Sequence, residues 1–145
     1  MQQSFRSSSA ADPWILVVDD DRLMLTIMAG LIRQEGFEKV DQARDGNEAL
    51  KKFLVRKPPI VFLDIEMPEL DGIETLRAIK EFGVSTQVVM ISARPTAHRV
   101  EAAKEGGAAG FLVKPISQKR IGDAIRACLR RADRIAGDVE LFMFS

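Results

Sequence analysis

Four short runs of apolar residues constrain the fold of this chain more than any other feature of its sequence. They cover Ile15–Val18, Ile60–Leu63, Val88–Ile91 and Phe111–Val113. Each run is too short for a helix and rich in β-branched residues or Phe, which is typical of strands buried on both faces. A weaker run of mixed polarity, Lys39–Ala43, predicts a further strand at the edge of the same sheet.

Segments with helical periodicity separate these strands. The first has an apolar stripe of Met24, Ile27, Met28 and Leu31 and ends near Gly36. The second and third begin at pairs with capping-box spacing, in which an acid at the helix start and a glutamate three residues later bond each other's backbone. These pairs are Asp45 with Glu48 and Asp71 with Glu74, and the inner faces behind them are Ala49, Leu50 and Phe53, then Leu76 and Ile79.

The last two helices differ in how much apolar surface they offer. The fourth, over residues 96–105, has only Val100 and Ala103 on its inner face, so we expect it to pack lightly. The fifth begins after Ser117 and carries Ile121, Ile125 and Cys128 or Leu129; over residues 117–136 it has six basic and two acidic side chains.

Five strand–helix repeats predict an α/β protein with a doubly wound, five-stranded parallel sheet and helices on both faces. The chain has 145 residues, enough for one domain. We expect a disordered tail over residues 1–12, the folded domain over residues 13–136 and an apolar extension over residues 137–145.

The extension continues an apolar spacing of four and three that is typical of a coiled-coil seam. Its members are Ile121, Ile125, Cys128, Ala132, Ile135, Val139 and Phe142. The extension could dock on its own domain, but the length of the seam favours a second copy of the chain or another partner.

Composition excludes several classes of function. Lys and Arg number 21 and Asp and Glu number 21, so a strongly basic nucleic-acid binder is not expected. One cysteine and one histidine exclude a disulfide framework and a site with two histidine ligands. No apolar run is long enough to insert in a membrane, and the first residues lack a signal peptide, so we expect a cytoplasmic protein.

Charged and polar side chains come directly after the buried runs. They are Asp19-Asp20-Asp21 after the first, Asp64 with Glu66 after the second, Ser92 after the third and Lys114-Pro115 after the fourth. Because the carboxyl ends of parallel strands meet at one edge of the sheet, we expect these side chains to form a single site.

The charges of this edge predict its chemistry. Asp19, Asp20 and Asp64 bring three negative charges, and Lys114 brings one positive charge. The excess of negative charge suits a divalent cation. Carboxylate oxygens favour Mg²⁺ or Mn²⁺. A site with a metal ion, a carboxylate, a lysine and a hydroxyl can accept a phosphoryl group. The metal ion and the lysine neutralise the phosphoryl oxygens while the carboxylate attacks the phosphorus.

The residues along this edge resemble a known family. Asp64-Ile65-Glu66-Met67-Pro68-Glu69-Leu70-Asp71-Gly72 is similar to the D-x-x-M-P-x-x-D-G signature of response-regulator receiver domains of two-component signalling. Val17-Val18-Asp19-Asp20-Asp21 resembles the family's acidic pair, Ser92-Ala93 its Ser/Thr-Ala, and Phe111-Leu112-Val113-Lys114-Pro115 its aromatic-x-x-Lys-Pro. The resemblance covers residues 14–136 and implies a flavodoxin-like sheet of order 2-1-3-4-5.

The resemblance also implies roles for individual residues. Asp64 would accept the phosphoryl group, with Lys114, Ser92 and the backbone N–H of Ala93 binding its oxygens. Asp20, Asp64 and the backbone carbonyl of Glu66 would bind Mg²⁺, and Asp19 would hold a metal-bound water. Phe111 would be the switch aromatic that rotates inward as Ser92 moves.

The same resemblance implies the partners. The phosphoryl donor would be a histidine kinase or a histidine phosphotransfer protein. The output would be a protein bound on the face formed by the fourth helix, fifth strand and fifth helix, with a homodimer possible. We expect a stand-alone receiver, and a fragment of a larger regulator is the alternative.

Other interpretations compete with these roles. Asp19 and Asp20 could cap the first helix, although Asp21 could do so equally well. Phe111 could be an ordinary core aromatic. Glu66 and Arg94, each two residues beyond a site residue, could pair across the mouth of the site and tune the phosphoryl lifetime.

A phosphatase of the haloacid dehalogenase type also uses an aspartate after a buried strand. Its Asp-x-Asp pattern is not met here, because Glu66 stands at the second position and Met67-Pro68 comes after it. Turnover of an added phosphomonoester would favour that class over a receiver.

Overall fold

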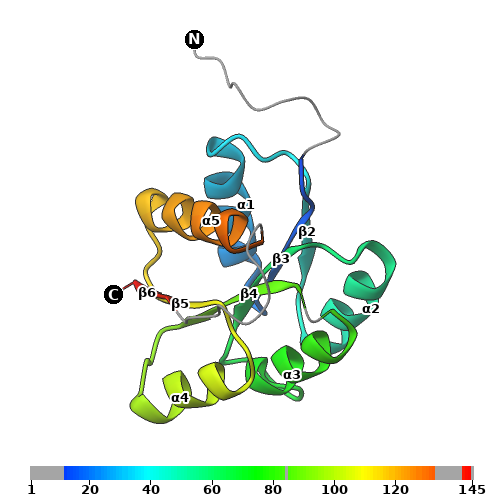
Figure 1. Ribbon diagram of the computed structural model, residues 1–145, viewed down its shortest axis with the longest axis vertical. Helices are drawn as coiled ribbons and strands as arrows, with labels where there is room; N and C mark the ends of the chain where they lie inside the picture. Colours follow the sequence, from blue (N-terminus) through cyan, green and yellow to red (C-terminus); the bar gives the residue numbers. More distant parts are fainter. Residues whose placement is uncertain (1–11, 84, 133–141, 145) are drawn as a thin grey trace.

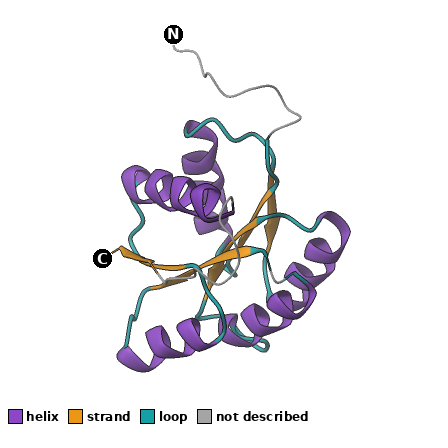
Figure 2. Cartoon of the chain, in the orientation of Figure 1, coloured by secondary structure: helices purple, strands orange, loops and turns teal. Residues whose placement is uncertain are grey.

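The computed structural model describes residues 12–83, 85–132 and 142–144. Its centre is a parallel sheet, drawn in Figures 1 and 2, in the order β2-β1-β3-β4-β5-β6. The strands are β1 (Ile15–Val18), β2 (Val40–Ala43), β3 (Ile60–Asp64), β4 (Gln87–Ser92), β5 (Gly110–Val113) and β6 (Phe142–Phe144). The predicted five-stranded order is confirmed, and a sixth strand extends it.

Five helices cover the two faces of the sheet. They are α1 (Arg22–Gln34), α2 (Gly46–Arg56), α3 (Gly72–Phe82), α4 (Ala97–Glu105) and α5 (Gln118–Ala132). Figure 2 shows α1 and α5 on one face of the sheet and α2, α3 and α4 on the other. Within the described ranges, no helix has both the length and the apolar character needed to cross a membrane.

Each face of the sheet has its own core, because successive strand residues point to opposite sides. Leu16 and Val18 of β1 pack toward α2, α3 and α4, in a cluster that also holds Phe53 and Phe111. Ile15 and Val17 pack in the opposite cluster with the inner sides of α1 and α5, among them Met28, Ile32, Ile121 and Ile125. The central strands are therefore buried on both faces, as their unbroken apolar runs predicted.

The predicted apolar stripe of α1 is partly wrong. The buried residues of this helix are Leu25, Met28, Ala29 and Ile32, and the side chain of Ile27 is 43% exposed. The sequence of α1 is apolar around most of its circumference, so its spacing fits two stripes. Packing against α5 and the sheet buries the stripe that contains Leu25 and Ile32 instead of the predicted one.

The helix starts agree closely with the sequence. Asp21 caps α1 by accepting a hydrogen bond from Leu23 N, so Asp19 and Asp20 are not its N-caps. Asp71 and Glu74 form the reciprocal capping box. Asp45 caps α2, but the Glu48 carboxylate accepts from Arg44 N, which makes that predicted box incomplete.

The two helices that flank β5 are held very differently. α5 buries Ile121, Ala124, Ile125 and Cys128, whereas the one fully buried side chain of α4 is Ala103. The light packing predicted for α4 is confirmed. Burial also raises the pKa of the Cys128 thiol to about 12.

The described part of the C-terminal extension, residues 142–144, departs from the predicted seam. Phe142–Phe144 forms β6, which runs parallel to β5 with Phe142 opposite Gly110. Docking on a second copy was favoured from the sequence, but this segment pairs with the sheet of its own chain. Ile135 and Val139 of the seam, and the tail over residues 1–11, lie outside the described residues.

Candidate phosphoryl-acceptor site

Three carboxylates meet at the carboxyl edge of the sheet. Asp19 and Asp20 come after β1 and Asp64 ends β3, and one oxygen from each lies within 4.8 Å of the others. Asp19 and Asp64 are both 2% exposed, while Asp20 faces solvent. The sequence prediction that these three residues converge is met by the geometry.

Lys114 reaches this cluster from the end of β5. Its Nζ donates to Asp19 Oδ2 at 3.1 Å and lies 3.4 Å from Asp64 Oδ1. Burial acts to lower the pKa of Lys114, but attraction to Asp64 and Asp19 outweighs it, and the pKa is raised. The lysine therefore stays charged beside the carboxylates. The Lys114–Pro115 peptide is cis.

Burial dominates the electrostatics of Asp64. Burial, reinforced by the charge of Asp19, raises the pKa of Asp64 from 3.8 to about 7, although Lys114 acts in the opposite direction. Asp64 Oδ1 is buried and accepts no hydrogen bond from any described residue. Buried polar atoms without hydrogen bonds are uncommon, and a carboxylate oxygen of this kind beside two other acids fits a hard divalent cation.

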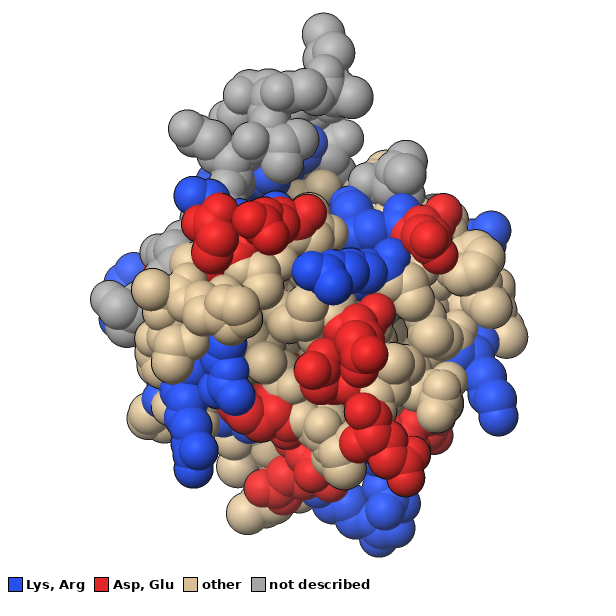
Figure 3. Space-filling model, turned by 90° about the horizontal axis from the view of Figure 1, so that it is seen from below, with Lys and Arg blue, Asp and Glu red and all other residues tan. Residues whose placement is uncertain are grey.

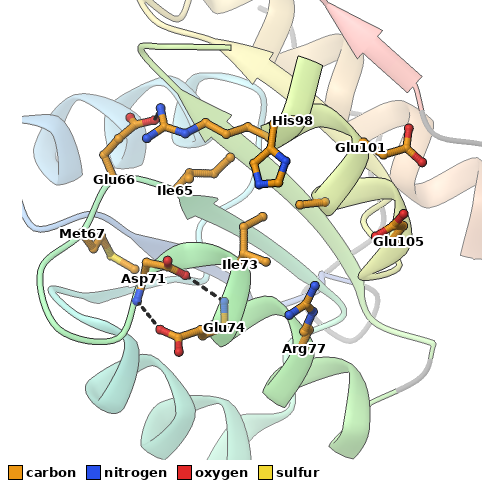
Figure 4. Close-up of a pocket in the computed structure, with 12 residues that line it drawn as sticks. Ile65, Glu66, Met67, Asp71, Ile73, Glu74, Arg77, His98, Glu101 and Glu105 are labelled. Carbon is orange, nitrogen blue, oxygen red and sulfur yellow. Dashed lines mark hydrogen bonds and ion pairs between the residues drawn. The ribbon is translucent and has the colours of Figure 1, made fainter. Parts of the chain in front are cut away.

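The loop after Asp64 is shaped by its signature residues. Gly72 N donates to Ile65 O at 3.0 Å. A Cβ on Gly72 would lie 2.3 Å from the Asp64 carbonyl oxygen, so the start of α3 can approach Asp64 only with glycine at this position. Figure 4 shows the neighbouring capping box of Asp71 and Glu74. The D-G pair thus fixes the backbone that presents Asp64.

Ser92 and Ala93 lie at the end of β4 and face the side chain of Glu66. Ser92 is fully buried, and its Oγ donates a short hydrogen bond to Glu66 Oε2. Ala93 N donates to Glu66 Oε1 at 3.2 Å. The two predicted phosphoryl-binding donors therefore share one carboxylate acceptor in this structure, a contact that the sequence did not predict.

The ion pair predicted between Glu66 and Arg94 is corrected by the structure. Glu66 Oε2 lies 2.6 Å from Nη1 of Arg99, in the first turn of α4. Arg94 contributes its backbone instead: its N–H donates to Ser92 Oγ, and its carbonyl accepts from Arg99 Nη1 at 3.0 Å. A helical residue in the first turn of α4 reaches back to the loop, which spacing from Ser92 alone did not indicate.

The surface beside the site is a groove of about 810 Å³ between α3 and α4. Its charged lining comprises Glu66, Asp71, Glu74, Arg77, Arg99, Glu101 and Glu105. Figure 3, seen from the side of α3 and α4, shows Asp and Glu side chains gathered across the middle of this face. Phe111 lies fully buried in the core cluster beneath it, so its ring is inside the protein.

Comparison with known proteins identifies the class. The family model of the response regulator receiver domain matches residues 15–126. The chain belongs to this family, whose members are switches of two-component signalling and not enzymes in the ordinary sense. The resemblance predicted from the motifs is confirmed, and the alternative of a haloacid-dehalogenase-type phosphatase is overturned.

Chemotaxis regulators are among its relatives. The chain is 40% identical over 111 residues to the chemotaxis protein CheY of Listeria monocytogenes, covering 77% of this chain and 93% of that protein. It is 36% identical over 115 residues to CheY of Bacillus subtilis, covering 79% and 96%. A solved complex of Borrelia burgdorferi CheX and CheY with BeF₃ and Mg superimposes with a TM-score of 0.78, at 33% identity and covering 83% and 92%.

Proposed function

We propose that Asp64 accepts a phosphoryl group from a phosphohistidine of a partner kinase or phosphotransfer protein. The observation that carries the proposal is the buried Oδ1 of Asp64, which accepts no hydrogen bond although it lies among two further carboxylates and the Lys114 ammonium. In this step an Asp64 oxygen attacks phosphorus, the phosphorus–nitrogen bond breaks and its electron pair stays on the imidazole.

The surrounding residues orient and neutralise the phosphoryl group. Lys114 pairs with one of its oxygens, and the Ser92 hydroxyl and Ala93 N–H donate to others. Lys114 already lies beside Asp64, so this cation needs little reorganisation when charge arrives. Phe111 acts as the aromatic whose packing changes with the movement of Ser92.

Mg²⁺, or Mn²⁺ in its place, fits the remaining negative charge of the cluster. Asp20, Asp64 and the backbone carbonyl of Glu66 would hold the ion, and Asp19 would orient water bound to it. Bound there, the ion would neutralise charge that develops on the phosphoryl oxygens.

The output surface in this proposal is the face formed by α4, β5 and α5. Support comes from the light packing of α4 and from the basic character of α5. Part of that positive charge is already paired, because Lys119 and Arg126 both contact Asp123. An acidic protein partner would therefore meet chiefly Arg120 and Arg130 of α5. The Borrelia relative, solved with CheX, is a receiver seen with a protein partner.

Labelling with acetyl phosphate tests the proposal. Wild-type protein should take up one phosphoryl group in the presence of Mg²⁺, and EDTA should prevent it. Asp64→Asn should abolish labelling, while Asp20→Asn should require far more metal. Undiminished labelling of the Asp64→Asn variant would show that the acceptor is elsewhere.

A further inference from the structure

The carboxylate of Glu66 occupies the two donors that the proposed function reserves for the phosphoryl group. A serine hydroxyl has one proton to donate, and a backbone amide has one N–H. The Ser92 proton goes to Glu66 Oε2 and the Ala93 N–H goes to Glu66 Oε1. A phosphoryl group on Asp64 cannot receive these hydrogen bonds while Glu66 keeps them.

Glu66 is also tied to α4. Nη1 of Arg99 lies 2.6 Å from Glu66 Oε2, and the Arg99 and Glu66 side chains are 31% and 28% exposed. The same nitrogen donates to the Arg94 carbonyl. Arg99 itself stands in the first turn of α4, where its backbone N–H bonds the capping Thr96. In Figure 4 Glu66 lies in the loop that begins after β3, across the groove from α4.

We propose that the Glu66 carboxylate competes with the phosphoryl group for the hydrogen-bond donors of Ser92 and Ala93. Arg99 is the positioning residue that couples the displacement of Glu66 to α4. Phosphorylation takes the Ser92 and Ala93 donors and expels the carboxylate. The Arg99 contact then changes with it, and the first turn of α4 loses one of its few attachments. The Arg99–Glu66 ion pair is partly exposed and therefore weak, so displacement of Glu66 by the phosphoryl group can break it. The inference rests on the proposed function of Asp64.

Binding of beryllofluoride with Mg²⁺, followed by calorimetry, tests the competition. In wild type, two hydrogen bonds to Glu66 must break before the anion can bind. We therefore expect beryllofluoride to bind about tenfold more tightly to Glu66→Ala than to wild type. Glu66→Gln, which keeps the size and one acceptor, should gain less. The matched control is Glu101→Ala, which removes a carboxylate from the same groove without touching Ser92 and should change affinity by less than about twofold.

Hydrogen exchange of the α4 amides tests the link. Beryllofluoride should speed exchange in the first turn of α4 in wild type. Arg99→Ala should show fast exchange before the anion is added and little further change, whereas Arg99→Lys, which keeps the cation, should restore the wild-type response. A wild-type response in Arg99→Ala would overturn the link.

The outcomes separate this inference from the proposed function. If Glu66→Ala and Glu66→Gln bind beryllofluoride no better than wild type, or if Glu101→Ala gains equally, the competition is wrong while labelling of Asp64 stands. If wild type neither binds the anion nor takes label at Asp64, both the proposed function and the competition fail. Should Glu66→Ala not fold, the Glu66→Gln affinity decides.

Discussion

α4 and α5 flank the same strand, yet they are attached to the sheet by different forces. α5 packs on the sheet through four buried side chains. It also contacts the end of α1, because Gln118 and Arg126 both hydrogen-bond to Glu35. α4 buries Ala103 and is linked to the site by the Arg99–Glu66 pair. Apolar burial does not depend on the charge of Asp64, whereas a polar contact to the site does. Under the proposed function, this difference would let α4 respond to phosphorylation more strongly than α5.

The largest expected effect comes from breaking the attachment of α5. Ile125→Ala removes a fully buried side chain and should cost about 2–5 kcal/mol of stability. Val100→Ala in α4, where the side chain is only partly buried, should cost about 1 kcal/mol. Urea unfolding measures both, and equal losses would contradict the difference between the helices.

The next largest effect concerns the charge of Asp64 itself. Its folded-state pKa of about 7 lies above the ordinary 3.8, so its protonated form favours the native state. The contribution of Asp64 to the stability of the metal-free protein should therefore be greatest near pH 4 and fall by about 2–4 kcal/mol as pH rises through 7.

Asp64→Asn is the matched variant for this pH dependence. It should lack that decline and be more stable than wild type at pH 8, and Mg²⁺ should stabilise wild type more than the variant. Thermal unfolding across this pH range, with and without Mg²⁺, provides the measurement. Parallel pH profiles for the two proteins would show that Asp64 ionises normally.

Hydrogen exchange after phosphorylation compares the helices directly. The proposed output face predicts changes in α4, β5 and α5, and the packing predicts that α4 changes most. We expect about tenfold faster exchange in α4 and less than about twofold in α5, because a tenfold change corresponds to about 1.4 kcal/mol of local opening. Changes confined to α1 and α2 would argue against this face.

The smallest effect is expected for phosphoryl lifetime. Replacing Glu66 and Arg94 together by Ala should open the mouth of the site to water and speed loss of the phosphoryl group about two- to fivefold, in line with the ~0–1 kcal/mol typical of exposed polar groups. Because Arg94 contributes only its backbone to the contacts at the site, Glu66→Ala alone should give most of the change. Decay of radiolabelled protein measures it, and unaltered decay would remove the role.

The strands and the meeting of the acidic residues were predictable from the sequence because they depend on local pattern and on one rule of topology. Buried runs identify the central strands, and parallel strands bring the residues at their carboxyl ends to one edge. Asp19, Asp20 and Asp64 therefore meet as expected, with Lys114 beside them.

Other contacts depended on information that spacing does not contain. The Arg99–Glu66 pair joins residues 33 positions apart and is decided by rotamers on two separate segments. The stripe of α1 was misassigned because Ile27 and Ile32 are equally apolar, and tertiary packing chose between them. Phe142 fitted a helical spacing, but so short an apolar segment can equally extend a strand.

The pairing of β6 with β5 has a consequence for behaviour at high concentration. An open strand edge presents unpaired N–H and C=O groups on which strands of other molecules can assemble. The opposite edge is β2, a short strand carrying Asp41 and Gln42, which resists such growth. Removing residues 142–144 would replace the three-residue edge strand β6 with the four-residue β5, so a chain stopped after Ala136 should show larger species in sedimentation than the full chain. The C-terminal residues would then be part of what keeps the protein in solution.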